Sequence, residues 1–300
     1  MDTLQNLKAF LAVAGSGSFS AAARRLGLAP SVVTKRIDQL EWAAKVALFA
    51  RSTRRVALTE AGERFLPRVR AAVAEFDDVL AEMARPRRYL EGHLWVKVPT
   101  TLGVLYVGAI LGRFQARHPK VSLDVVLTDR ALNPIDEGFD LAMGAFPASF
   151  GGVIDEPLCP LRRLVCASPA YLAARGAPRR PRDLAGHDTL NFLPSGPVWT
   201  FRSDRGPISV ELAPKLSTND NQVLFAAARE GNGVALLPSY VALPALRAGE
   251  LVQVLEAFPM PEMWIKAPVP ENRAQIPRVR ALLDFLKGCL DPVPPWERPD

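Results

Sequence analysis

Basic side chains that could bind phosphate groups are concentrated near the start of the chain. Residues 20–55 contain eight lysines and arginines against only two acids. Residues 1–90 hold 15 Lys and Arg against 9 Asp and Glu, an excess of +6, whereas residues 91–300 hold 22 of each. The whole net charge of +6 therefore lies in the first third of the chain. This distribution is typical of a polyanion-binding module joined to a neutral body, and a solvated basic face is the alternative on charge alone.

Three short amphipathic helices are expected to position these bases. Apolar residues at helical spacing predict a first helix over residues 3–14. Ser18 is a good N-cap for a second helix over residues 19–26, and Gly27 can end that helix in a left-handed turn. A third helix is predicted over residues 30–44, because proline is well tolerated at the first helical position.

A hairpin predicted over residues 48–59 completes a winged helix-turn-helix. The third helix would carry small and polar side chains on the face that enters the major groove, and the hairpin would place arginines at the phosphates or the minor groove. Ser20 can donate to a phosphate beside free backbone N–H groups. The alternative is a bundle of small helices with a basic face. The predicted DNA contacts are Ser20, Ser31, Thr34, Lys35, Arg51, Arg54 and Arg55.

A long helix is predicted from Thr59 to Arg85, about 40 Å in length. Thr59 would cap it, and Pro67 should kink or loosen its first turns. No neighbouring segment is long enough to cover its apolar stripe, so we expect a second copy of the chain to cover it. The predicted dimerisation residues are Phe65, Val69, Val73, Phe76 and Leu80.

From Gly92 onward, strand-like and helical runs alternate, which predicts an α/β body. No apolar run reaches the roughly 20 residues of a membrane span, and the N-terminus lacks a basic signal region. We therefore expect a cytoplasmic protein. Three isolated histidines predict no metal site, and no nucleotide-binding or catalytic motif is present. Cys159 and Cys166 are either buried filler or, less favoured by their apolar surroundings, a redox pair.

Two segments resemble the DNA-binding region of the LysR-type transcriptional regulators: residues 18–41 (SFSAAARRLGLAPSVVTKRIDQLE) and 48–63 (LFARSTRRVALTEAGE). Residues 167–172 (ASPAYL), 181–184 (PRDL) and 231–238 (GNGVALLP) are similar to that family's effector domain. The resemblance implies a ligand-responsive regulator and no enzyme. It adds Pro30 to the DNA contacts, and the neighbouring Arg36 is included with them.

The resemblance also implies the domain organisation. Residues 1–58 would form the winged helix-turn-helix, residues 59–90 a linker and dimerisation helix with a hinge, and residues 91–300 the effector domain. That domain would resemble periplasmic solute-binding proteins, with two α/β lobes. The first lobe is expected over about 91–162 and 267–290, the second over about 163–266, with a loose tail over 291–300.

Departures from the family pattern occur at both ends of the third helix. Ala29 is a poor N-cap, and Ala44 and Lys45 replace a glycine-containing end. The segment from Met143 to Pro147 is more apolar than is usual, which predicts a smaller or more apolar cleft.

The cleft between the lobes is predicted to hold a small organic inducer, a carboxylate, without any cofactor. Hydroxyls and helix N-terminal N–H groups at Thr100 and Thr101 favour an anion, although simple capping is the alternative. Phe201 could wall the cleft or pack the second lobe. The expected partners are duplex DNA, a second copy or a homotetramer, the inducer and RNA polymerase, but no membrane. The predicted effector residues are Thr100, Thr101, Thr128, Phe146, Phe201 and Asn219. The runner-up hypothesis is a solute-binding or enzymatic body with a nucleic-acid-binding appendage.

Overall fold

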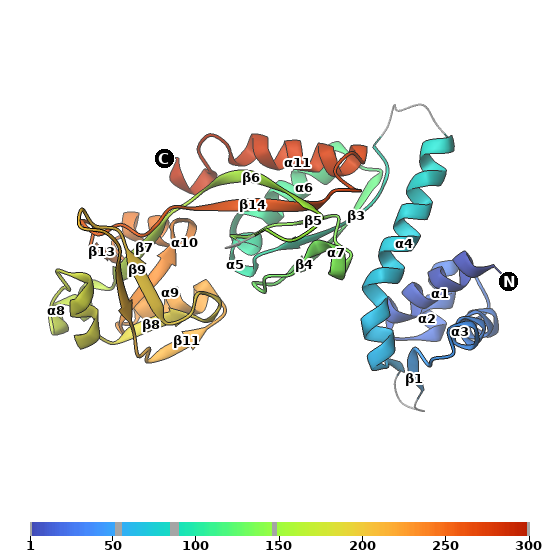
Figure 1. Ribbon diagram of the computed structural model, residues 1–300, viewed down its shortest axis with the longest axis horizontal. Coiled ribbons are helices and arrows are strands. Elements are labelled where there is room, and N and C mark those ends of the chain that lie inside the picture. Colours follow the sequence, from blue (N-terminus) through green and yellow to red (C-terminus); the bar gives the residue numbers. More distant parts are fainter. Residues whose placement is uncertain (1, 52–55, 85–89, 146–148, 299–300) are drawn as a thin grey trace. The chain divides into compact units, whose positions relative to one another are not determined.

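The computed structural model describes residues 2–51, 56–84, 90–145 and 149–298 (Figure 1). Its internal contacts divide the chain into two units, residues 1–93 with 132–139, and residues 94–131 with 140–300. The first unit thus includes the long helix that the sequence analysis treated as a separate linker. No helix in the described part of the chain is long and apolar enough to cross a bilayer.

The N-terminal unit is a winged helix-turn-helix followed by a long helix. Ser18 caps the second helix by accepting the Ala21 N–H, and Gly27 ends it at φ +66°. Ala29 makes no side-chain capping bond, yet the third helix begins at Pro30 and ends where Lys45 takes the left-handed conformation, at φ 53°. The predicted helices are therefore confirmed. The elements are α1 (Thr3–Ser16), α2 (Phe19–Leu26), α3 (Pro30–Ala44), β1 (Phe49–Arg51), β2 (Val56–Leu58) and α4 (Glu60–Ala84), with α7 (Pro134–Glu137) grouped here by its contacts.

The core of this unit lies between α1, α2, α3 and the hairpin. Phe10, Val33 and Ile37 are fully buried in it, and the rings of Phe10 and Phe49 lie 5.5 Å apart. Thr59 caps α4 by accepting the Gly62 N–H, as predicted. Gly62 is required at this point, because a Cβ there would lie 2.2 Å from the Leu48 carbonyl oxygen. The helix α4 continues through Pro67.

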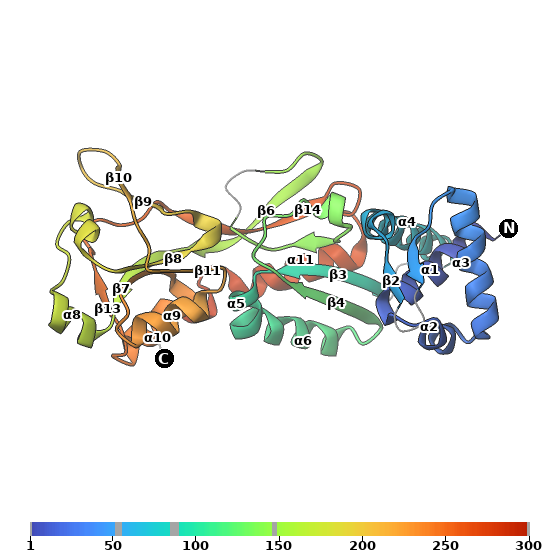
Figure 2. The same ribbon diagram turned by 90° about the horizontal axis from the view of Figure 1, so that it is seen from below.

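The first lobe of the second unit is built on the sheet order β4-β3-β5, in which β3 and β5 are parallel. The helix α6 contacts β4, and α11 contacts both α6 and β6 (Figures 1 and 2). A π-helical turn joins α5 to α6. The elements are β3 (Gly92–Val98), α5 (Thr100–Leu102), η1 (Gly103–Val107), α6 (Gly108–Arg117), β4 (Val121–Leu127), β5 (Leu141–Ala142), β6 (Val153–Leu161), β14 (Met263–Pro270), α11 (Pro277–Leu290) and η4 (Pro295–Glu297).

The second lobe contains a five-stranded sheet with the order β11-β8-β12-β7-β13. The strands β8, β11 and β12 run parallel, and β7 is antiparallel to both of its neighbours, β12 and β13. The elements are β7 (Arg163–Ala167), α8 (Pro169–Arg175), η2 (Pro181–Gly186), β8 (Thr189–Phe192), η3 (Leu193–Ser195), β9 (Val198–Phe201), β10 (Ile208–Glu211), β11 (Leu216–Thr218), α9 (Asn221–Arg229), β12 (Val234–Pro238), α10 (Ser239–Arg247) and β13 (Val252–Val254).

The two lobes are connected by an antiparallel pair of long strands, β6 and β14 (Figure 1). The chain enters the second lobe at Arg162, between β6 and β7, and returns through residues 255–262 into β14. The predicted fold class, a winged helix-turn-helix with a two-lobed α/β domain, is therefore confirmed.

The described part of the C-terminal tail, residues 291–298, is packed, contrary to the prediction of a loose tail over residues 291–300. Trp296 is 2 % exposed and packs edge-on against Tyr106 and Tyr240, with ring centroids 5.0 and 5.6 Å away. Arg247 donates to the backbone carbonyls of Trp296 and Arg298. An apolar indole and several polar anchors hold the described part of the tail, residues 291–298, against both lobes.

Candidate nucleic-acid interface and effector site

The exposed face of α3 carries the predicted DNA-reading side chains. Pro30, Ser31 and Lys35 are exposed, and Thr34 is half-buried with its hydroxyl donating to the Pro30 carbonyl, 3.1 Å away. The buried stripe of Val33, Ile37 and Leu40 fixes the opposite face against the core. The N-terminal end of α3 therefore presents small polar groups and the exposed ammonium of Lys35 to solvent. Major-groove recognition requires such a face.

Two further predicted contacts flank this face. Ser20 is exposed in the first turn of α2, and Arg36 is half-buried with its guanidinium donating to Gln5. The backbone of Arg51 lies in β1, whereas Arg54 and Arg55 fall outside the described residues. The structure thus locates the helix residues, and their contacts with DNA, like those of the wing arginines, remain predictions.

Glu41 is a positioning residue that the sequence analysis did not single out. One carboxylate oxygen of Glu41 accepts the backbone N–H groups of Leu48 and Phe49, at 2.7 and 3.1 Å. It therefore ties the end of α3 to the start of the hairpin and fixes the wing relative to the recognition helix. An acid three residues before a helix end offers no local signal for this role.

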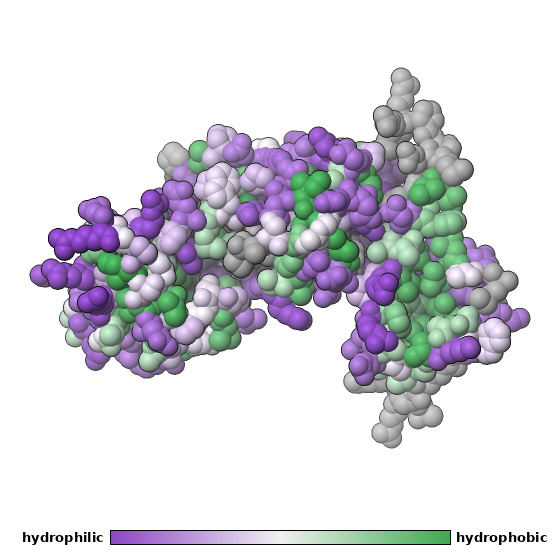
Figure 3. Space-filling view, viewed as in Figure 1, coloured by the Kyte–Doolittle hydropathy of each residue, from purple (hydrophilic) through white to green (hydrophobic). Residues whose placement is uncertain are grey.

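The apolar stripe of α4 is covered in part by its own chain, which corrects the prediction that a second copy covers all of it. Phe65 and Val69 pack against the core of the helix-turn-helix, and Val73 is 7 % exposed. The reason is that α4 folds back along α1, where Lys8 forms an ion pair with Asp77 at 2.6 Å. Phe76 and Leu80 remain 45 % and 48 % exposed, and hydrophobic side chains gather over α4 (Figure 3).

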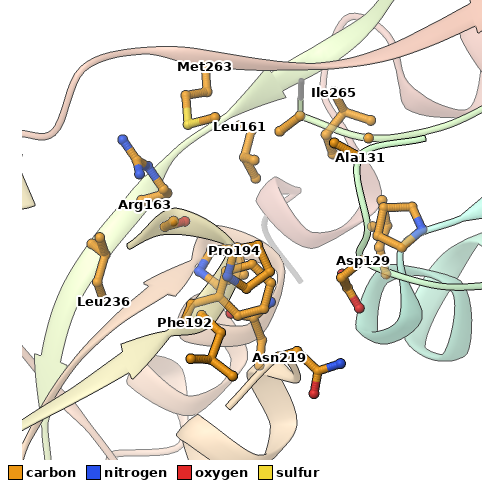
Figure 4. Close-up of a pocket in the computed structure, with 18 of the residues that line it drawn as sticks. Asp129, Ala131, Leu161, Arg163, Phe192, Pro194, Asn219, Leu236, Met263 and Ile265 are labelled. Carbon is orange, nitrogen blue, oxygen red and sulfur yellow. The ribbon is translucent and has the colours of Figure 1, made fainter. Parts of the chain in front are cut away.

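A cavity of about 620 Å³ lies in the second unit, with walls from both lobes and both connecting strands (Figure 4). We call it the cleft cavity. Its apolar wall includes Leu161, Trp199, Met263 and Ile265. Asn219, at the carboxyl side of β11, also lines it. The size and mixed lining are those of a small-molecule site.

The cleft cavity is lined by three cations and one acid. The cations are Lys97, Arg130 and Arg163, and the acid is Asp129. The Lys97 ammonium is almost fully buried and donates to the Met143 carbonyl at 3.0 Å. Burial lowers the pKa of Lys97 to about 8, and the neighbouring Asp129 charge opposes that shift. The lining therefore carries a net positive charge at neutral pH, which favours an anionic ligand.

The threonines expected to hold the anion are engaged elsewhere. The Thr100 N–H donates to a carboxylate oxygen of Asp129 at 3.3 Å, so the protein's own anion occupies the start of α5. The buried Thr101 hydroxyl donates to Asp220 at 3.1 Å and accepts the Asn221 N–H at 3.2 Å. Thr101 therefore joins the first lobe to the N-terminus of α9 in the second. The capping alternative concerned the helix that these threonines open, whereas Thr101 accepts an N–H of α9 and no described side chain caps α5.

Most of the remaining predicted effector residues do not line the cleft cavity. The Thr128 hydroxyl accepts the Arg130 N–H, and Phe146 falls outside the described residues. Phe201 is fully buried in the core of the second lobe, which corrects its placement on the cleft wall in favour of packing. Of the predicted residues that the structure describes, Asn219 alone lines the cleft cavity. Lys97 and Arg163 were missed because strands far apart in the sequence bring them together.

The two cysteines of the predicted pair are buried and free. Burial, reinforced at Cys159 by nearby carboxylates, raises the pKa of each thiol to about 12. Both thiols therefore stay protonated at neutral pH, whereas the deprotonated thiolate is the reactive form. The geometry favours packing over redox chemistry.

Comparisons with known proteins agree with this architecture. The family model for the bacterial regulatory helix-turn-helix protein of the lysR family matches residues 4–63, and that for the LysR substrate binding domain matches residues 87–290. The chain belongs to the LysR family of transcriptional regulators. The predicted function, a DNA-binding regulator with an effector-binding domain, is therefore confirmed.

Individual relatives of this LysR-type regulator are distant but span its whole length. It is 29 % identical to the probable HTH-type transcriptional regulator LtrA of Klebsiella pneumoniae, covering 97 % of this chain and 96 % of LtrA. It is 30 % identical to the HTH-type transcriptional regulator DmlR of Escherichia coli K12, covering 95 % and 93 %. The structure of CrgA, a LysR-type regulator from Neisseria meningitidis, matches with a TM-score of 0.61 and 28 % identity over 95 % of this chain and 97 % of CrgA.

Proposed function

We propose that this regulator binds a small organic carboxylate in the cleft cavity and adjusts its affinity for DNA in response. The observation that carries the proposal is the buried Lys97 ammonium on the wall of that cavity. An ammonium shielded from water attracts an incoming anion more strongly than an exposed one does. The carboxylate would lie toward Lys97 and Arg130, with its apolar part against Trp199 and Ile265.

This position differs from the one predicted at Thr100. Because Asp129 already accepts the Thr100 N–H, a second carboxylate at that spot would be repelled. Lys97 and Asp129 line the same cavity with opposite charges. The ligand carboxylate would therefore bind near the Lys97 ammonium and away from Asp129. Asn219 lines the same cavity from the second lobe and supplies an amide for a polar group of the ligand.

The affinity for such a carboxylate should fall as the pH rises through 8. Lys97 is charged below its pKa of about 8 and neutral above it, so the attraction is present at neutral pH and lost in alkali. Losing one charge-assisted hydrogen bond of about 1.5 kcal/mol weakens binding about tenfold between roughly pH 7 and pH 9.5. Thermal shift against a panel of carboxylates identifies a ligand, and calorimetry on the full chain then measures its affinity across this pH range.

The control for this experiment is Lys97→Gln, which keeps a hydrogen-bond donor but cannot titrate. The variant should bind the same carboxylate weakly and equally at both pH values, and the matching amide should show no pH dependence with either protein. A wild-type affinity that stays constant through this range would rule out Lys97 as the anion contact.

On the DNA side, we propose that Lys35 contacts a base edge or an adjacent phosphate. Lys35→Ala should weaken binding to an operator selected from random duplexes by roughly 1–3 kcal/mol, because a base contact of this kind is lost. The matched control is Lys45→Asn at the opposite end of α3, which removes the same charge from an exposed site that favours a left-handed backbone. Gel-shift titrations at fixed salt should show a larger loss of operator affinity for Lys35→Ala than for Lys45→Asn. Equal losses of affinity would show that Lys35 contributes only non-specific electrostatic attraction.

The oligomer and its partners complete the proposal. We propose that the chain pairs through the exposed part of α4, that two pairs form a tetramer, and that the assembly acts in the cytoplasm and contacts RNA polymerase. Exposed Phe76 and Leu80 support the pairing. We further propose that the chain regulates and does not catalyse, in agreement with the regulators to which it is related.

A further inference from the structure

A second cavity, of about 460 Å³, lies beside the cleft cavity in the second unit. We call it the hinge cavity, because its walls include both segments that connect the lobes. Residues 160–163 form one wall where β6 passes into β7, and residues 259–264 form another where the chain returns into β14. The end of β13 together with Leu255, Glu256 and Phe258 closes it. A molecule bound here would contact both connections at once.

The interior of the hinge cavity is apolar. Val165, Leu255 and Met260 are buried side chains of its wall, and Phe258 packs against the same core. Trp264, which also lines the cavity, is 44 % exposed. Leu255 takes a left-handed backbone at φ 59°, although its side chain is buried. Such strain in a non-glycine residue is concentrated at ligand sites.

Arg163 supplies a charge to this apolar space. Its Nε atom is shielded from solvent, and no acceptor among the described residues bonds it. Burial lowers the pKa of its guanidinium. Arg163 lines the hinge cavity as well as the cleft cavity, and its side chain points away from Asp129 and Asn219 (Figure 4). A guanidinium with incomplete partners in a partly desolvated site fits a carboxylate.

The other charges of the hinge cavity stand at its rim and balance one another. Arg162 is paired with Glu297, and Arg202 is exposed, as are the two lining acids, Glu256 and Glu262. Exposed charges are screened by water, so they contribute less than the shielded Arg163. The interior therefore has an apolar wall and one cation.

We propose that the hinge cavity is a second small-molecule site, separate from the cleft cavity, that binds an amphipathic monocarboxylate. The carboxylate pairs with the Arg163 guanidinium, and the hydrocarbon part lies between β7, β13 and residues 255–264. Leu161, Arg163 and Met263 line both cavities. A ligand in the hinge cavity therefore repositions part of the cleft wall, which couples the two sites reciprocally.

Two methionines allow the site to be located directly. Met260 lines the hinge cavity only, Met263 lines both cavities, and Met143 is fully buried and lines neither. The full chain, labelled with ¹³C at the methionine methyl groups, is titrated with octanoate and followed by NMR. We expect a saturable shift of Met260 and Met263, with Met143 unchanged. A shift of Met263 without Met260 would place octanoate in the cleft cavity and overturn the proposal, as would no shift.

The charge requirement is tested with an uncharged probe and two arginine variants. Octanoate should bind at least about tenfold more tightly than 1-octanol, and Arg163→Gln should remove that difference. Arg205→Gln is the matched control, because Arg205 is exposed and does not line the hinge cavity. If 1-octanol shifts Met260 at the same concentration as octanoate, the site is merely apolar and the proposal is wrong.

A cavity-filling variant separates this proposal from the one for the cleft. Met260→Trp should abolish octanoate binding in calorimetry while a carboxylate of the cleft cavity still binds. A wild-type cleft affinity that stays constant between pH 7 and pH 9.5, with the Met260 shift intact, would refute the cleft proposal alone. Unchanged octanoate binding by Met260→Trp would refute the hinge site alone.

Discussion

Replacing Arg273 with methionine should lower the free energy of unfolding of the effector domain by about 3–5 kcal/mol. Arg273 and Asp140 form an ion pair whose side chains are 4 % and 3 % exposed. The other oxygen of Asp140 accepts the Trp95 N–H at 2.7 Å. Removing the guanidinium would leave a carboxylate buried in the first lobe with one backbone donor. Equilibrium urea unfolding, followed by tryptophan fluorescence, measures the loss.

The pair matters for function because of what it joins. Asp140 directly precedes β5 and accepts the Trp95 N–H of β3, and Arg273 follows β14. The pair therefore holds distant segments of the first lobe together. The same strand β3 carries Lys97 into the cleft cavity. The double variant Arg273→Met with Asp140→Asn removes both charges and should recover most of the stability. If Arg273→Met alone costs less than about 1 kcal/mol, the pair is not the connection described here.

The helix-turn-helix was predictable because its signals are local. Ser18, Gly27 and Pro30 mark helix ends by capping and backbone preferences that act within a few residues. The buried stripe of Val33, Ile37 and Leu40 follows from helical spacing alone. Lys45 at the end of α3 shows the limit of such local signals, because a lysine takes the left-handed conformation that glycine usually adopts at a helix end.

The effector site was less predictable because it depends on contacts between distant segments. Hydroxyls at Thr100 and Thr101 indicate an anion site by position, but Asp129 and Asp220 reach them from elsewhere in the fold. Lys97 reads as one polar residue in a strand, and only the assembled sheet buries it beside a cavity. Capping signals are therefore ambiguous until the nearest acid in space is known.

The C-terminal tail and the helix α4 show the same limitation in packing. The proline-rich tail contains few periodic apolar residues, which favours a loose segment, yet Trp296 finds an aromatic site between Tyr106 and Tyr240. For the apolar stripe on α4, the prediction was wrong in the opposite direction. Its periodicity predicts a buried face, but the pattern does not say whether α1 of the same chain or a second copy covers it.

Changing Phe76 and Leu80 to glutamate should convert the regulator to monomers and lower its operator affinity about 100-fold or more. These side chains are nearly half exposed on α4, whereas Phe65 and Val69 are covered by the helix-turn-helix core. Burying a large apolar side chain is worth about 1.5–3 kcal/mol, so four such side chains across a symmetric pair are a substantial part of an interface. Two like charges on each copy would add repulsion.

The effect on DNA binding follows from the pairing of readers. Each winged helix-turn-helix reads one half-site, and a linked pair binds the second half-site as an intramolecular step. Arg64→Gln with Arg68→Gln changes the net charge of α4 by the same amount without altering Phe76 or Leu80, and should leave the oligomer intact. Light scattering gives the oligomeric state, and titration of one- and two-half-site duplexes gives the affinity. A glutamate variant that stays oligomeric would show that pairing uses another surface, while monomers with full affinity for the double site would show that pairing does not contribute to operator binding.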